Sequence, residues 1–326
     1  MSDTKPRILV TEPIPESVIT YLSSFGEVTV GQKGKYISEA HLIQDVSAFH
    51  AVLSMLSNPI TENVLRAGSN LKVCANFAVG YNNIDVVAAR KLGIKVANTP
   101  NVLTEACGDF AMALLMASSR NFYKAEKYLR DGNFNGWEPL GFLGPELRGK
   151  KLGIIGMGRI GQAFAKRAVA FGMEIQYFNR NRLSNELERE LGATFISSVN
   201  EIASSSDVLS LNCPLSSETH HLVDEQLLKI MPKHALLINI SRGPVVDEEA
   251  LANALHAGEI GGAGLDVFEK EPIVHANLLT APNCTMVPHI ASATFETREA
   301  IGMLAAEAIK KVLAGEPDSN IPNLIN

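Results

Sequence analysis

The stretch that decides the fold is KLGIIGMGRIGQ, residues 151–162, in which a short apolar strand runs directly into a glycine-rich turn and then an amphipathic helix. The spacing of the three glycines predicts a different structural role for each. Gly156 permits the tight turn, Gly158 lets the backbone approach a pyrophosphate, and Gly161 lets the helix pack closely on the strand. The stretch therefore predicts a dinucleotide-binding turn.

The residues around this turn strengthen the prediction. The N–H groups at the helix start, which include those of Arg159 and Ile160, would face the phosphates. Residues 174–178 (EIQYF) supply the second strand that a βαβ unit needs. The alternative is a Rossmann-like unit without a ligand, in which the glycines serve only to pack strand against helix.

The end of that second strand indicates which dinucleotide is bound. NAD sites usually place an Asp or Glu about twenty residues beyond the glycines, where it accepts hydrogen bonds from the ribose hydroxyls. Here the place holds Asn179, followed by Arg180 and Arg182. A neutral amide and two guanidinium groups would attract a 2′-phosphate. We therefore expect NADP(H) to be preferred, with NAD(H) as a second cofactor; the alternative is that the arginines are solvated loop charges.

Composition sets bounds that agree with this prediction. A chain of 326 residues exceeds what one core usually fills, so we expect two domains. A formal charge of -6 offers no footprint for nucleic acid or an anionic membrane. The absence of an apolar leader or a spanning run predicts a cytoplasmic protein. The four scattered cysteines, Cys74, Cys107, Cys213 and Cys284, are expected to be buried free thiols.

Strand and helix signals alternate along the whole chain, which predicts an α/β fold with two doubly wound parallel sheets. One sheet would be a flavodoxin-like substrate domain and the other a Rossmann cofactor domain, with a cleft between them. The expected strands of the first are residues 7–11, 28–30, 51–55, 72–77 and 94–98. Those of the second begin at residue 151 and continue with 174–178, 193–196, 207–211, 235–240, 262–267 and 284–287.

Two long helical stretches, residues 102–130 and 294–313, are expected to bridge these units. If the second returns the chain to the first sheet, the substrate domain is discontinuous. It would comprise residues 1–101 and 292–326, and the cofactor domain residues 102–291. The irregular residues 131–149 predict either an arm that packs on a second subunit or a surface loop.

Three places just past strands of the second series carry the groups expected to perform catalysis. Arg242 follows residues 235–240, a set of carboxylates including Asp266 and Glu271 follows the next strand, and His289 follows the last. The carboxyl ends of parallel strands form the edge where such sheets bind ligands. Reduction of a 2-keto acid by hydride needs a fixed cation for the carboxylate and carbonyl, and a proton donor for the oxygen.

Each group also has a plainer explanation. Arg242 could pair with a surface carboxylate, His289 could be a satisfied core histidine, and Asp266 could cap a strand end. The residues at 269–271 could form a charged turn.

Taken together, these motifs resemble the D-isomer-specific 2-hydroxyacid dehydrogenase family, most closely its glyoxylate/hydroxypyruvate reductase branch. The resemblance covers nearly the whole chain. It rests on residues 76–85 (NFAVGYNNID), 98–105 (NTPNVLTE), the glycine turn, 212–215 (NCPL), 241–243 (SRG), 265–272 (LDVFEKEP) and 289–292 (HIAS).

The resemblance implies roles for these residues. Arg242 would bind the substrate carboxylate and carbonyl, and His289 would protonate the carbonyl oxygen in reduction or act as the base in oxidation. Glu271 would hold the His289 ring and raise the pKa of the imidazole. Asp266 would hydrogen-bond the nicotinamide carboxamide. Further residues implied to contact the cofactor are Thr104, Cys213, Pro214, Ile240 and His289 itself.

The substrate and assembly are also implied by the resemblance. The backbone N–H groups at Val79 and Gly80 would bind the substrate carboxylate, and Leu56 would wall a pocket for a C2 or C3 keto acid. 2-Ketogluconate and bulkier phenylpyruvate-type acids stay open as substrates of another D-2-hydroxyacid dehydrogenase, as does a nucleotide-sensing protein like the C-terminal binding protein corepressors. The family is generally dimeric, so a homodimer is implied.

Overall fold

Parallel strands alternate with helices through both parts of the chain, and each part forms its own sheet. The computed structural model describes residues 5–326. Residues 1–4, which belong to the amino terminus that was expected to lack a leader, lie outside this range. Contacts divide the chain into a first unit, Met1–Leu103 with Ala293–Asn326, and a second unit, Thr104–Ser292. The chain thus crosses after Leu103 and Ser292, close to the boundaries predicted at residues 101 and 291. Among the described helices, none combines the length and apolar character needed to cross a membrane.

The first unit contains a five-stranded parallel sheet in the order β2-β1-β3-β4-β5. Its strands are β1 (Arg7–Val10), β2 (Glu27–Val30), β3 (Ala51–Ser54), β4 (Val73–Asn76) and β5 (Lys95–Ala97). Its helices are α1 (Glu16–Ser23), α2 (Glu39–Asp45), α3 (Glu62–Ala67), α4 (Val86–Lys91) and α13 (Phe295–Leu313), with the 3-10 turns η1 (Lys35–Ile37), η2 (Val46–Ala48) and η4 (Asp318–Asn320). This strand order is the flavodoxin-like one.

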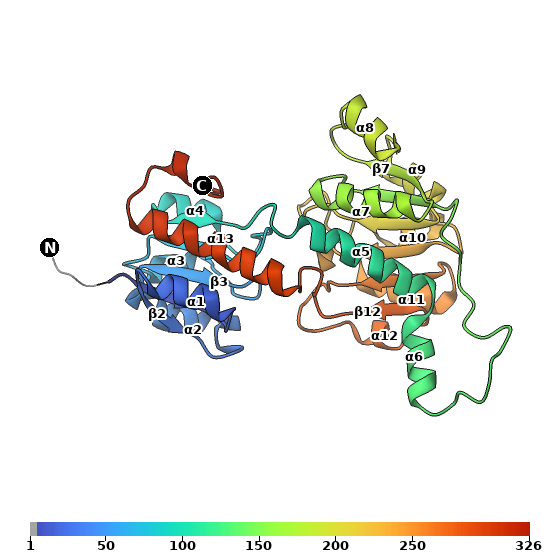
Figure 1. The fold of residues 1–326 in the computed structure, drawn as a ribbon, viewed down its shortest axis with the longest axis horizontal. Coiled ribbons are helices and arrows are strands. Elements are labelled where there is room, and N and C mark those ends of the chain that lie inside the picture. Colours follow the sequence, from blue (N-terminus) through green and yellow to red (C-terminus); the bar gives the residue numbers. More distant parts are fainter. Residues whose placement is uncertain (1–4) are drawn as a thin grey trace. The chain divides into compact units, whose positions relative to one another are not determined.

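Burial explains why these segments form a sheet covered on both faces. Every residue of β3 and β4 is buried, which is typical of parallel strands between two helix layers. The last long helix, α13, packs against α1 and β4, so the end of the chain closes the unit that its beginning opens (Figure 1). The first unit is therefore discontinuous in sequence.

The second unit contains a seven-stranded parallel sheet in the order β12-β11-β10-β9-β6-β7-β8, the doubly wound Rossmann arrangement. Its strands are β6 (Lys151–Ile155), β7 (Glu174–Phe178), β8 (Ala193–Phe195), β9 (Val208–Leu211), β10 (Leu236–Asn239), β11 (Gly262–Leu265) and β12 (Cys284–Met286). Its helices are α5 (Thr104–Ser119), α6 (Phe122–Arg130), α7 (Arg159–Ala170), α8 (Asn185–Leu191), α9 (Val199–Ser205), α10 (Glu225–Ile230), α11 (Glu248–Ala257) and α12 (Ala276–Leu279), with the 3-10 turn η3 (Gly243–Val245).

Alternate residues of its central strands enter two separate cores. In β9, Leu209 and Leu211 join the core beneath α10 and α11, whereas Val208 joins the core beneath α5 and α7. The two-residue period of a strand produces this division. Burying each such side chain contributes about 1.5–3 kcal/mol, so both faces hold the sheet rigid behind the loops at its edge.

The expectation of one helix over residues 102–130 was wrong. The chain forms α5 and α6, separated at Arg120 and Asn121, and Asn121 has a left-handed backbone with φ 52°. Asparagine tolerates that conformation, which ends α5 and redirects the chain. The following residues 131–149 contain no helix or strand and form the green loop that extends from α6 (Figure 1).

Candidate active site

The glycine turn after β6 has the geometry expected of a phosphate cradle. Gly156 has φ 97°, and a Cβ there would lie 2.5 Å from the backbone nitrogen of Cys213. A Cβ on Gly161 would lie 2.5 Å from the carbonyl oxygen of Gly156. A Cβ on Gly158, by contrast, would meet nothing within 4 Å. Packing within the protein thus accounts for Gly156 and Gly161 but not for Gly158.

The space in front of Gly158 lies where a dinucleotide would be held. Gly158 is the N-cap of the twelve-residue helix α7, whose first residues are Arg159 and Ile160. The first N–H groups of a helix have no intrahelical partner and favour an anion. A glycine with no steric neighbour at this point fits a pyrophosphate that approaches the backbone.

Asn179 ties the end of β7 to this turn. Its side-chain oxygen accepts a hydrogen bond of 2.7 Å from the backbone nitrogen of Met157. Gly156 also donates its N–H to the carbonyl of Phe178 at 3.0 Å. The amide at residue 179 is therefore a support of the glycine turn as well as a candidate ribose contact.

The two arginines after Asn179, which the sequence alone does not distinguish, have different environments. Arg182 donates two hydrogen bonds of 2.8 Å to the carboxylate of Glu188, which also accepts one of 2.6 Å from the hydroxyl of Tyr177. These bonds, chiefly that from Arg182, lower the pKa of Glu188 to about 2. The guanidinium of Arg182 is thus bound to Glu188. The side chain of Arg180, by contrast, is 78% exposed and pairs with Glu218 at 3.3 Å.

The loop after β9 runs beside the glycine turn. Cys213 is buried, and burial raises the pKa of its thiol to about 11, so it is a neutral wall residue. Pro214 follows it and is held through its carbonyl by Thr219. The other proposed cofactor residues lie at element ends: Thr104 opens α5, and Ile240 is buried just after β10.

The four cysteines, all within the described residues, form no disulfide. Cys74, Cys107 and Cys213 are buried and Cys284 is partly buried. Desolvation raises the pKa of Cys74 and of Cys284 to about 12. Among residues 5–326, no cluster of three or more His, Cys, Asp or Glu residues has the arrangement of a metal site.

Arg242 is held by a tight loop at the end of β10. The Asn239 amide donates to the Arg242 carbonyl at 3.0 Å, and its oxygen accepts from the Ser241 backbone nitrogen, also at 3.0 Å. A Cβ on Gly243 would overlap the backbone of Phe268, so glycine is required for the loop to pack there. Burial lowers the pKa of Arg242, while the nearby Glu271 opposes that shift. The guanidinium stays charged, because the ordinary pKa of an arginine side chain lies far above neutral pH.

His289 and Glu271 are in direct contact. The Nδ1 atom of His289 lies 2.9 Å from Oε2 of Glu271, and Oε1 of Glu271 accepts the N–H of Phe268 at 3.1 Å. Partial burial would raise the pKa of Glu271, but His289, the Phe268 N–H and Arg242 together hold it below its usual value. The carboxylate therefore stays ionised and fixes the imidazole through Nδ1, which leaves Nε2 for a substrate.

The backbone at His289 is unusual, with φ 53° in the left-handed region. Its N–H donates to the carbonyl of Asp266 at 2.8 Å. The carboxylate of Asp266, which is fully buried, accepts the N–H groups of Ile290 at 2.6 Å and Ala291 at 3.0 Å. Burial raises the pKa of Asp266 in spite of these two bonds. Asp266 thus anchors the segment that carries His289, a role that was not predicted from the sequence.

In the first unit, the proposed substrate loop after β4 is shaped by amide side chains. Asn76 donates to the carbonyl of Gly80 at 2.7 Å, and Asn98 donates to the carbonyl of Val79 at 2.8 Å. These two bonds fix the backbone of the loop, and its N–H groups are the donors that it could offer a carboxylate.

A second set of amides holds the turn that contains Leu56. Asn83 donates to the carbonyls of Met55 at 3.0 Å and Asn58 at 3.1 Å, and Asn58 accepts the Met55 N–H at 2.7 Å. Leu56 lies between these fixed points and is partly exposed.

Several supporting residues were not predicted, because the loop conformations that bring them to their partners are not evident from the residue pattern. Asn239, Tyr177 and Glu188 fix the loops that carry Arg242 and Arg180, and Glu218 faces Arg180 from another loop. A polar residue at the end of an apolar strand, as Asn239 is, was the one available signal.

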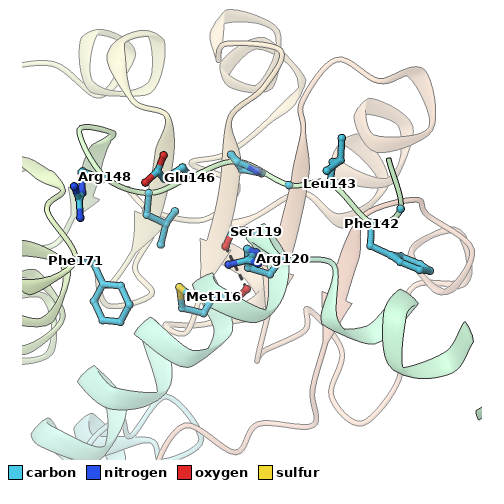
Figure 2. Close-up of a pocket in the computed structure, with 12 residues that line it drawn as sticks. Met116, Ser119, Arg120, Phe142, Leu143, Glu146, Arg148 and Phe171 are labelled. Carbon is cyan, nitrogen blue, oxygen red and sulfur yellow. Dashed lines mark hydrogen bonds between the residues drawn. The ribbon is translucent and has the colours of Figure 1, made fainter. Parts of the chain in front are cut away.

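A cavity of about 520 Å³ lies elsewhere in the second unit, between the end of α5 and residues 141–148 (Figure 2). Its lining includes Met116, Arg120, Phe142 and Phe171, and it contains no candidate catalytic residue.

Comparison with known proteins matches the second unit to a family model. Residues 112–291 match the model described as "D-isomer specific 2-hydroxyacid dehydrogenase, NAD binding domain". This region includes the glycine turn and all three candidate catalytic residues.

Full-length relatives extend the match to the first unit. A glyoxylate reductase of Thermococcus onnurineus is 44% identical, with 99% of this chain and 96% of the relative covered. A crystal structure of a glyoxylate reductase from Paecilomyes thermophila superposes with a TM-score of 0.83 at 33% identity, covering 96% of this chain and 97% of that one. An NADPH-dependent glyoxylate/hydroxypyruvate reductase from Sinorhizobium meliloti, in complex with NADP and malonate, gives a TM-score of 0.85 at 36% identity, covering 95% and 94%.

Proposed function

This chain belongs to the D-isomer specific 2-hydroxyacid dehydrogenase family, and from that premise we propose that it reduces glyoxylate and hydroxypyruvate to the 2-hydroxy acids with NADPH. The observation that carries the proposal is the 2.9 Å contact between His289 and Glu271 with Arg242 close by. A proton donor, the carboxylate that orients it and a fixed cation are the groups that reduction of a keto acid requires.

The second unit would hold the dinucleotide at its glycine turn. The open space at Gly158 and the start of α7 would take the pyrophosphate, with Cys213 and Pro214 forming a wall. When bound, the reduced cofactor supplies a hydride to the carbonyl carbon of the substrate.

The chain's own residues would then bind the substrate and move the proton. Arg242 would pair with the carboxylate and polarise the carbonyl, because a buried guanidinium binds a planar anion with two hydrogen bonds. His289 would donate the proton on Nε2 to the carbonyl oxygen. Glu271, ionised at Oε2, would stabilise the imidazolium that precedes this transfer. In oxidation the same Nε2 would accept the proton.

A preference for NADPH is supported by the residues at the end of β7. The position that carries a carboxylate in NAD sites holds Asn179, and the exposed guanidinium of Arg180 is beside it. The Sinorhizobium meliloti relative is itself described as NADPH-dependent. Arg182 gives no support, because Glu188 binds its guanidinium.

Small keto acids are the proposed substrates because of the loops of the first unit. Val79 and Gly80 would contribute N–H groups to the substrate carboxylate, and Leu56 would limit the size of the pocket. The relatives named glyoxylate reductase support this choice over a keto-sugar acid.

A homodimer formed through the second unit is part of the proposal. Large apolar side chains of α6 and the following loop are exposed, among them Trp137 at 84% and Leu140 at 81%. Exposed apolar residues gathered on one segment are typical of an interface, and a second copy would cover them. Light scattering after gel filtration tests this: we expect a dimer, and we expect Trp137→Ser with Leu140→Ser to weaken it. A monomeric native chain would refute this part.

The decisive experiment follows the absorbance of NADPH and NADH separately with glyoxylate, hydroxypyruvate, 2-ketogluconate and phenylpyruvate. We expect rapid NADPH oxidation with the first two acids. Equal or faster rates with NADH would refute the cofactor preference. Silence with every acid would refute the enzyme assignment and favour a nucleotide-sensing protein.

A further inference from the structure

Two loops of opposite charge face each other across the proposed adenosine end of the cofactor site. Arg180 lies on the loop after β7, and Glu218 lies on the loop after β9. Nη1 of Arg180 is 3.3 Å from Oε2 of Glu218, with side chains 78% and 69% exposed. Glu218 belongs to none of the roles described above.

The loop that carries Glu218 is an ordered turn. The hydroxyl of Thr219 donates to the carbonyl of Pro214 at 2.7 Å and accepts the N–H of Ser216 at 2.8 Å. The N–H of His220 donates to the carbonyl of Ser216 at 2.9 Å. The direction in which residue 218 leaves the backbone is therefore fixed by its neighbours.

The loop that carries Arg180 is fixed at both sides. Asn179 binds the N–H of Met157, and Arg182 binds Glu188 with two hydrogen bonds. The N–H of Leu183 also donates to the hydroxyl of Tyr177 at 2.9 Å. Because both backbones are held, Arg180 and Glu218 leave the chain at fixed points that are within reach of each other.

We propose that Glu218 is a specificity-determining residue: a built-in counter-charge that occupies Arg180 and so limits selection for the 2′-phosphate. The proposal rests on the proposed use of NADPH. A 2′-phosphate that binds Arg180 must displace or share it with Glu218, whereas a 2′-hydroxyl carries no charge and competes with neither. Glu218 would thus lower the affinity for NADPH and leave that for NADH unchanged.

The test is calorimetric titration of the full chain with 2′,5′-ADP and with 5′-AMP, which differ only in the 2′-phosphate. Removing one exposed ion pair changes affinity modestly, so we expect Glu218→Gln to bind 2′,5′-ADP about 3- to 5-fold more tightly. Binding of 5′-AMP should stay within about twofold. The matched control is Glu186→Gln, an exposed glutamate of α8 that pairs with Arg189 and should alter neither titration.

A double-mutant cycle locates the effect. In an Arg180→Ala background, Glu218→Gln should no longer tighten 2′,5′-ADP binding, because the group for which the phosphate competes is gone. A full gain in that background would overturn the proposal, as would an equal gain for 5′-AMP or no gain for either nucleotide.

The titrations separate this inference from the proposed activity. If the chain binds both nucleotides but reduces no keto acid, the activity fails and Glu218 is judged by binding alone. If the chain binds neither nucleotide, the inference fails together with the cofactor assignment.

Discussion

The loops at the carboxyl ends of the two sheets are held by different chemistry. In the first unit, the neutral amides of Asn58, Asn76 and Asn83 fix the loops that carry Leu56 and Gly80. In the second unit, carboxylates share this task with the amides of Asn179 and Asn239. Asp266 binds the backbone beyond His289, Glu271 binds its ring, and Glu188 binds Arg182.

This difference in supporting groups matches the two proposed tasks, which are binding an anion and transferring a proton. An amide cannot titrate, so the first unit presents the same donors at every pH at which it is folded. The carboxylates of the second unit can titrate, and burial, hydrogen bonds and charged neighbours shift their pKa values. The amide-held loops of the first unit are thus insulated from pH, whereas the carboxylates beside His289 are coupled to it.

The largest effect should come from removing His289, the group of the second unit that is proposed to move a proton. We expect His289→Ala to lower keto-acid turnover by about 10²- to 10⁴-fold, the usual contribution of a general acid. Dinucleotide affinity should be retained, as measured by titration. His256→Ala, on α11 of the same unit, is the control and should leave turnover unchanged. Unaltered turnover in His289→Ala would mean that another group donates the proton.

A smaller effect should distinguish glycines that serve a ligand from glycines that serve the fold. We expect Gly158→Ala to weaken dinucleotide binding by about 10- to 100-fold, the loss of one hydrogen-bonded charged contact, without lowering the melting temperature. Gly156→Ala should lower both, because φ 97° and the contact with Cys213 exclude a side chain. Full binding by Gly158→Ala would place the pyrophosphate elsewhere.

The amide network offers the next test. Asn76→Ala leaves the buried partners of that amide unsatisfied, which costs about 1–3 kcal/mol of unfolding free energy. We expect the KM for glyoxylate to rise by about tenfold with dinucleotide affinity unchanged. Because the network is neutral, the stability loss should be the same across the pH range in which the protein is folded. A loss that varied strongly with pH would contradict the division between the two units.

The smallest effect should appear at Glu188, as a pH dependence. Its pKa is lowered from 4.5 to about 2 in the folded protein. A lowered pKa stabilises the fold above the unfolded value, and this contribution is lost as pH falls through the folded value. Melting temperatures of the native chain and Glu188→Gln should therefore differ at neutral pH and converge between about pH 4.5 and 2. A constant difference would show that charge is not the cause.

Much of the fold could be predicted from sequence because its signals are local. The strand at residues 174–178 was predicted with the bounds that β7 has, since apolar side chains alternate in it and it lies between Gly172 and the polar residues that begin at Asn179. The break at Asn121 was not predicted, because residues on both sides favour a helix and the left-handed backbone leaves little trace in composition.

The candidate site divides in the same way. Strand-end positions for Arg242 and His289 follow from the alternation of strands and helices. Which of the two arginines after Asn179 is available could not be predicted, because it depends on Glu188 and Tyr177 meeting Arg182 in three dimensions. The backbone anchoring by Asp266 likewise depends on a loop 24 residues further along the chain.

The left-handed backbone of His289 means that fold stability and the proposed turnover favour different residues at position 289. With φ 53°, glycine would adopt this conformation without the steric cost that a side chain incurs. If only the backbone counted, selection for thermal stability would favour replacing His289 with glycine. Selection for the proposed turnover would favour keeping the histidine. A directed-evolution lineage kept under heat but released from activity should therefore lose this histidine early.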